Sequence, residues 1–150
     1  MKAIMVLIFL CFGICNAQKN ALYITFQPVD FGVGLRYDRK ITNDVGLYTS
    51  VSYGKFRLPH GGYIKDHMRY VAGGLFYLKE YHNTRPSFGV GIIYATYGER
   101  NITMPNFPDS VFDPISFELS FNTQCYKRFV IGVRFDFIKN ESALDFGWRF

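Results

Sequence analysis

The stretch that decides the fold is Phe129–Phe150, FVIGVRFDFIKNESALDFGWRF. Its first part alternates large apolar side chains with small or charged ones, among them Arg134 and Asp136. A polar turn follows at 139–142, and the alternation then resumes and continues to the terminal Phe150. Successive side chains of a strand point to opposite faces, so each half is predicted to be a strand with one apolar face and one polar face.

The chemistry of these two faces distinguishes a membrane sheet from a soluble one, because soluble antiparallel sheets also alternate. Bulky aromatic residues on one face, with arginine, aspartate and glycine on the other, suit a sheet whose outside meets lipid and whose inside is polar. With the terminal Phe150, the alternating Phe146 and Trp148 before it and repeated hairpins upstream, the chain resembles the small bacterial outer-membrane β-barrels of the OmpA/OmpX type.

The resemblance covers the architecture of the chain beyond its first 17 residues. It implies an all-β fold, an eight-stranded antiparallel up-and-down transmembrane β-barrel. It also implies that Phe146, Trp148 and Phe150 form the signal read by the outer-membrane insertion machinery, and that outer-membrane lipid surrounds the barrel.

The rest of the chain repeats the period-two pattern. Six further strands are predicted, at 21–27, 31–39, 45–55, 67–78, 87–98 and 115–122. In the least clear of them, at 67–78, the residues assigned outward are Met68, Tyr70, Ala72, Gly74, Phe76 and Leu78. The longer connections at 57–66 and 99–114 are expected outside the cell, and those at 40–44, 79–85 and 123–128 in the periplasm.

The inward face is predicted to carry charges of both signs. The set comprises Arg36, Asp38, Lys55, Arg69, Glu118, Arg134, Asp136, Asp145 and Arg149. Eight strands leave an interior just wide enough for side chains to fill, and buried charges are tolerated when they pair. We therefore expect a plug of ion pairs and no open pore, the alternative being that some of these residues lie in water at strand ends.

Aromatic residues toward the strand ends are expected at the lipid-water boundary. They are Tyr37, Tyr53, Phe56, Tyr77, Tyr81, Tyr94, Tyr97 and Trp148. Aromatic packing in a soluble sandwich is the alternative reading of the same residues.

The first segment is predicted to be a signal peptide cleaved after Ala17, because Lys2 precedes a short apolar run. The run is shorter than the roughly 20 residues that a spanning helix needs. Retention as an anchor and a lipoprotein modified at Cys15 are the alternatives. Cleavage would leave Cys125 as the one cysteine, which excludes an intramolecular disulfide and a cysteine zinc site.

Charge gives little support for nucleic-acid binding. Of 17 basic and 12 acidic residues, cleavage removes Lys2 alone, so the mature net charge is 16 − 12 = +4. The basic residues are scattered, without a run or a basic helix. No phosphate loop, zinc signature or dinucleotide fingerprint is present, so no cofactor is expected. His60, His67 and Asp66 could form a weak metal site, but two histidines and an aspartate in one loop are common by chance.

The sequence favours a non-enzymatic barrel, located in the bacterial outer membrane, that acts through its exposed loops in adhesion, surface recognition or envelope integrity; its extracellular ligand is unknown. The apolar loop residues expected to make contacts are Pro59, Tyr63, Ile64, Phe107, Val111 and Phe112. One alternative is a soluble secreted or periplasmic barrel binding a small apolar ligand, which requires an apolar inner face. Another is a lipid hydrolase using Ser110 with His60 or His67, for which no motif gives support.

Overall fold

The computed structural model describes residues 20–28, 32–57, 63–82, 84–97, 100–101, 114–125, 128–138 and 141–150. Its strands are β1 (Asn20–Gln27), β2 (Gly32–Lys40), β3 (Val45–Arg57), β4 (Tyr63–Tyr77), β5 (Arg85–Thr96), β6 (Arg100–Asn101), β7 (Ile115–Cys125), β8 (Phe129–Asp136) and β9 (Glu141–Arg149). Within these ranges no helix is long and apolar enough to cross a membrane.

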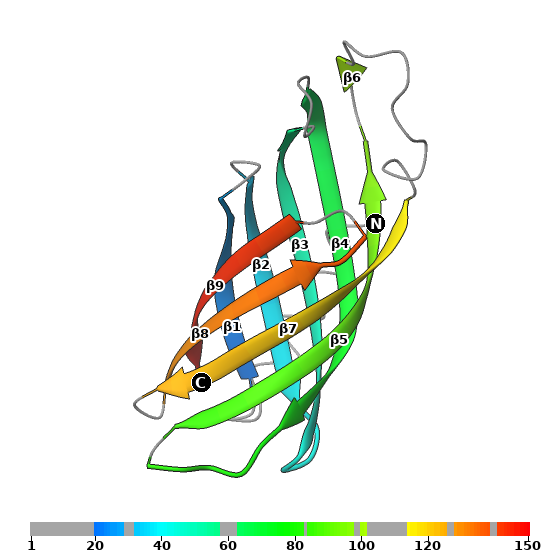
Figure 1. Ribbon diagram of the computed structural model, residues 1–150. Coiled ribbons are helices and arrows are strands. Elements are labelled where there is room, and N and C mark those ends of the chain that lie inside the picture. Colours follow the sequence, from blue (N-terminus) through cyan, green and yellow to red (C-terminus); the bar gives the residue numbers. More distant parts are fainter. Residues whose placement is uncertain are drawn as a thin grey trace, which may run out of the picture.

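Eight of the strands form a closed barrel (Figure 1), which confirms the predicted fold class. Around the barrel the order is β3, β2, β1, β9, β8, β7, β5 and β4, and pairing of β4 with β3 completes the ring. Every pairing is antiparallel. Where the first and last strands meet, Asn20 N donates to Phe150 O at 3.2 Å and Phe150 N donates to Asn20 O at 2.9 Å. A closed sheet of this kind leaves no backbone edge for lipid to contact.

The barrel has two different ends. One, which we call the turn end, contains Asn20, Phe150 and the connections from β2 to β3, β4 to β5 and β7 to β8. We call the opposite one the loop end. In Figure 1 the turn end lies at the bottom, and of the eight wall strands β3 and β4 rise furthest toward the loop end, with the short β6 above them.

Several strands are longer at the loop end than the sequence pattern predicted. β3 continues to Arg57 and β4 begins at Tyr63, with a register shift between Gly54 and Phe56. Half of the predicted loop 57–66 is therefore strand, in a hairpin that extends beyond the other wall strands. The short β6, inside the predicted loop 99–114, pairs with the start of β4. Hydrophobic alternation marks only the part of a strand that lies in lipid, and the pairing continues beyond it among polar residues.

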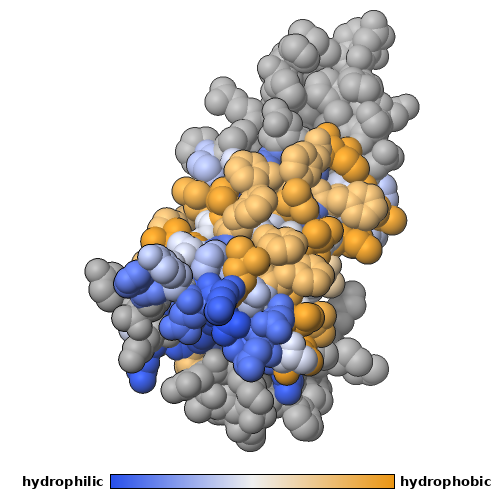
Figure 2. All heavy atoms as spheres, turned by 60° about the horizontal axis from the view of Figure 1, so that its bottom comes forward, coloured by the Kyte–Doolittle hydropathy of each residue, from blue (hydrophilic) through white to orange (hydrophobic). Residues whose placement is uncertain are grey.

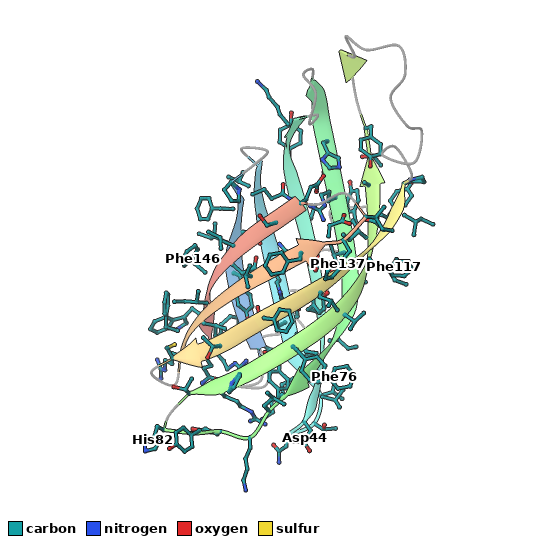
Figure 3. All side chains as sticks on the ribbon, viewed as in Figure 1. Asp44, Phe76, His82, Phe117, Phe137 and Phe146 are labelled. Atoms are coloured by element: carbon teal, nitrogen blue, oxygen red, sulfur yellow. The ribbon has the colours of Figure 1, made fainter. Side chains whose placement is uncertain are left out.

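The two faces of the wall differ in chemistry as predicted. Phe135, Phe146 and Trp148 point outward and are 41%, 41% and 51% exposed. Figure 2 shows apolar residues in a band above the polar turn end, and in Figure 3 the labelled Phe117 and Phe146 project away from the ribbon. The outward assignment of alternate residues from Met68 to Leu78 holds: four of them are exposed and Met68 and Gly74 are partly exposed, while Val71 and Leu75 between them are buried inside. The outer face is therefore a belt suited to acyl chains.

Candidate functional site: the interior charge network

The centre of the interior is organised around Arg36, whose side chain is fully buried. Arg36 and Asp38 lie two residues apart on β2 and so point to the same face, with Arg36 Nε 2.7 Å from Asp38 Oδ1. Arg36 Nη1 lies 2.9 Å from Asp145 Oδ2 on β9. The hydroxyl of Tyr23 donates to Asp38 Oδ2 at 2.7 Å, and the guanidinium lies 4.3 Å from the ring centroid of Tyr48. The charge of Arg36 is thus balanced by two carboxylates and two aromatic neighbours.

Arg134 on β8 joins more strands than any other side chain described in this network. Its Nε lies 2.9 Å from Asp145 Oδ2, and its Nη2 donates to Thr25 Oγ1 at 3.0 Å. Its Nη1 donates to Ser50 Oγ at 2.8 Å and lies 3.4 Å from Glu118 Oε2. These partners lie on β9, β1, β3 and β7, so one guanidinium crosses the lumen and ties opposite walls together.

Neutral side chains complete the hydrogen bonding of the central carboxylates. Thr25 donates to Asp145 Oδ1 at 2.7 Å, and the hydroxyl of Tyr48 donates to Glu118 Oε1 at 3.0 Å. Ionised groups are tolerated away from water only when such partners satisfy them. Tyr48 and Ser50 alternate with the exposed Leu47 and Thr49 along β3 and so face inward, but alternation gives no sign of these contacts.

A second group lies nearer the loop end. Arg69 Nη2 on β4 is 3.3 Å from Asp136 Oδ2, and Arg69 Nη1 forms an ion pair with Glu141. Ser116 donates to Asp136 Oδ2 at 2.8 Å. Glu141 had been expected in a turn, but it begins β9 opposite Asp136 and is buried. Its register opposite Asp136 makes it an inward residue that apolar alternation alone does not reveal.

The structure brings most of the expected plug residues together. Arg36, Asp38, Arg69, Glu118, Arg134 and Asp136 all lie buried within the two groups. Arg149 is also inward and 9% exposed, but it lies at the turn end, where it contacts Gln124. Lys55 was expected inside and is exposed, because it follows the buried Gly54 and alternation turns it outward. Counting Glu141 and Asp145, three guanidinium groups meet five carboxylates, a formal balance of 3 − 5 = −2.

An apolar cluster fills the interior beside β3, β4 and β5. It contains Tyr48, Val71, Leu75, Tyr77 and Ile93. Tyr77 had been expected at the lipid-water boundary, but it follows the outward Phe76 and is therefore inward, only 6% exposed. Tyr97 had also been expected at that boundary, but its ring stacks on the buried His67, with ring centroids 4.9 Å apart.

Candidate groups for catalysis or metal binding are sparse in the described part of the chain. There, no group of three or more His, Cys, Asp or Glu residues is arranged to hold a metal ion. His67 is buried beside Tyr97 and His82 lies in the turn after β4, whereas His60 and Ser110 fall outside the described residues. Of the expected loop contacts, Pro59, Phe107, Val111 and Phe112 also fall outside, and only the backbone of Tyr63 and Ile64 is described, at the start of β4.

Comparison with solved structures supports the same architecture. A de novo designed transmembrane β-barrel matches with a TM-score of 0.57 and 9% identity, over 90% of this chain and 98% of the other. The outer-membrane protein Ail of Yersinia pestis, in a phospholipid bilayer nanodisc, matches with a TM-score of 0.53 and 15% identity, over 89% of this chain and 99% of the other. No protein-family model matches the sequence, and no curated protein matches it.

These likenesses show a fold, that of small eight-stranded transmembrane barrels. The chemistry of the two faces of the wall also argues against a soluble barrel that binds a small apolar ligand. A carrier of apolar ligands needs an apolar lumen and a polar exterior, whereas here the described lumen holds the charge network and the belt is apolar.

Proposed function

We propose that this chain, an eight-stranded transmembrane β-barrel of the small outer-membrane type, resides in the bacterial outer membrane as a non-conducting, non-enzymatic support for surface loops. Adhesion, surface recognition and envelope integrity are the roles such loops would serve. The observation that carries this proposal is the interior network, in which Arg36, Glu118 and Asp145 are at most 2% exposed.

A filled lumen limits where the chain can act. The central groups link β1, β2, β3, β7, β8 and β9 through side chains, so side chains in contact with one another occupy the middle of the described barrel. The outer apolar belt is covered by lipid. Binding to other molecules is then left to the two ends.

The loop end is proposed to face the cell exterior. Support comes from the protruding β3–β4 hairpin and from the even number of wall strands, which returns Phe150 to the end at which β1 begins. In this orientation the turn end is periplasmic. A signal peptide ending near Ala17 and an insertion signal of Phe146, Trp148 and Phe150 would deliver the chain to that membrane.

The loop function is tested by replacing only residues 58–62 and 102–113 with Gly/Ser linkers, which leaves β3, β4 and β6 intact. Bacteria expressing the wild type are expected to adhere to cultured epithelial cells better than bacteria carrying an empty vector, and the double replacement is expected to abolish the difference. Replacement of the turn 41–44 by a Gly/Ser linker is the matched control, which is expected to retain adherence. Adherence that survives loss of both loops contradicts a loop function.

Alanine at Pro59, Phe107 and Phe112, which lie in the replaced loops, and at Tyr63, the first residue of β4, tests the expected contact residues. Heat-modifiable migration in outer-membrane extracts, in which a folded barrel runs differently before and after boiling, should stay unchanged in every variant. A folded, surface-exposed quadruple variant that adheres as well as the wild type would exclude these four residues as contacts.

A further inference from the structure

Three cations surround one tyrosine inside the turn end. Relative to the ring centroid of Tyr77, Lys40 Nζ lies at 5.9 Å, Arg85 Cζ at 5.3 Å and Arg149 Cζ at 5.4 Å. They come from the last residue of β2, the first of β5 and the last of β9, and Tyr77 is the last residue of β4. Strand ends far apart in sequence thus bring three positive charges to one mouth of the barrel.

These cations differ from the arginines of the interior network in their partners. Arg36, Arg69 and Arg134 each form ion pairs with carboxylates. Among the residues that the structure describes, Lys40, Arg85 and Arg149 form none.

The mouth cations instead donate to neutral oxygens. Lys40 Nζ is 3.3 Å from Asn43 Oδ1, Arg85 Nε is 3.3 Å from the Leu78 carbonyl and its Nη2 donates to the Asn43 carbonyl, and Arg149 donates to Gln124. Neutral oxygens hold the side chains in place but offset their mutual repulsion less than a paired carboxylate would.

The surroundings add to the positive potential. The described charged residues of the turn end are the basic Arg39, Lys40, Lys79, Arg85, Arg128 and Arg149 and the acidic Asp38, Asp44 and Glu80, a balance of 6 − 3 = +3. Figure 2 shows the hydrophilic residues gathered at this end, below the apolar band. Lys40 and Arg85 are half-buried, so solvent reaches the mouth.

We propose that Lys40, Arg85 and Arg149 form an anion site at the turn-end mouth that binds a phosphate group. A phosphate can accept hydrogen bonds from several donors at once, and one guanidinium group can donate two parallel hydrogen bonds to two of its oxygens. The group belongs either to a phospholipid headgroup of the adjoining leaflet or to a small soluble phosphate. The competing explanation is that the three cations only offset the −2 balance of the network at a distance, which predicts no saturable binding.

The first arm of the test is calorimetric titration of the folded full chain in detergent micelles with inorganic phosphate at constant ionic strength. Arg85→Gln is expected to weaken binding about tenfold, the loss of one charge-assisted contact, and Arg85→Lys to retain most of it. Arg39→Gln is the matched control, because Arg39 lies at the same end but is exposed on the outer face.

The second arm measures retention of phosphatidylglycerol by the detergent-purified barrel with native mass spectrometry. Retention that is lost in Arg85→Gln but kept in Arg39→Gln, without binding of free phosphate, identifies a lipid headgroup as the source, and the reverse result identifies a soluble phosphate. Either supports the site, as does selective loss in both arms. Absence of binding in both arms, or equal loss in Arg85→Gln and Arg39→Gln, overturns it, and heat-modifiable migration confirms that each variant is folded.

Discussion

Arg134 and Asp145 meet in the middle of the barrel, with Nε of Arg134 2.9 Å from Oδ2 of Asp145. The same carboxylate lies 2.9 Å from Nη1 of Arg36 and accepts a hydrogen bond from Thr25 at 2.7 Å. In the barrel order β1 and β9 separate the strands of these two arginines. One carboxylate on β9 therefore links two cations whose strands do not pair with each other.

Replacing Asp145 by asparagine should strongly destabilise the barrel. The change keeps the shape but leaves Arg36 and Arg134 short of a buried negative partner, a loss that typically costs about 3–5 kcal/mol. Urea unfolding in lipid vesicles, followed by the fluorescence of the single tryptophan, Trp148, measures the free energy of unfolding.

The matched control for that variant is Asp44→Asn. It makes the same chemical change on an exposed turn, where substitutions usually move stability by less than about 0.5 kcal/mol. Equal effects at the two positions would mean that the interior carboxylate has no special role.

Charge reversal by Arg134→Glu should lower the temperature at which the folded band is lost in detergent. The introduced carboxylate would repel Glu118 and Asp145, with which the native guanidinium pairs. A destabilisation of about 3 kcal/mol or more corresponds to at least roughly 6 °C for a domain of this size. Arg128→Glu, at an exposed position of the turn end, serves as the control, and an unchanged melting temperature for Arg134→Glu would refute the plug.

Two glycines show that the inner face of the wall is crowded and the outer face is open. A Cβ on Gly34 would lie 2.6 Å from Ser52 Cβ and 2.8 Å from Ser52 Cα, whereas a Cβ on Gly74 would meet nothing within 4 Å. Gly34→Ala should cost about 1–3 kcal/mol through overcrowding. Gly74→Ala should be neutral or stabilise by about 0.4–1 kcal/mol, because alanine restricts the unfolded chain. The same unfolding assay would contradict this account if the two variants behaved alike.

The filled lumen predicts an electrically silent protein. Reconstituted in planar lipid bilayers, the wild type should show no stable open level, since the network occupies the cross-section between opposite walls. Steady single-channel steps from folded protein would be incompatible with a plug of ion pairs.

Period-two alternation was sufficient to predict the eight wall strands and which face is apolar. Gly132, Arg134 and Asp136 alternate with large apolar residues. When lipid surrounds the sheet, the apolar residues of such a strand must face outward and the polar ones inward. The alternation in β8 and β9 put Phe135, Phe146 and Trp148 on one face, and the arginine, aspartate and glycine on the opposite face identified that face as the outer one.

The partners inside could not be predicted in the same way. Arg134 and Ser50 are 84 residues apart in sequence, and their contact depends on how the strands are staggered around the closed barrel. Strand ends were also missed, because residues such as Glu141 pair beyond the apolar belt, where alternation carries no signal. Tyr77 lies near a strand end, as aromatic residues of the lipid-water boundary do, but its position next to the outward Phe76 turns its side chain into the barrel.

The central claim is that the apolar face of the wall meets acyl chains while charge lies within, and Trp148 reports on it directly. Trp148 is the single tryptophan and is 51% exposed on the outer face. The decisive measurement compares quenching of its fluorescence, in folded protein in vesicles, by lipids brominated on their acyl chains and by aqueous acrylamide. We predict strong quenching by the brominated lipids and weak quenching by acrylamide, and the reverse result would contradict a lipid-facing belt.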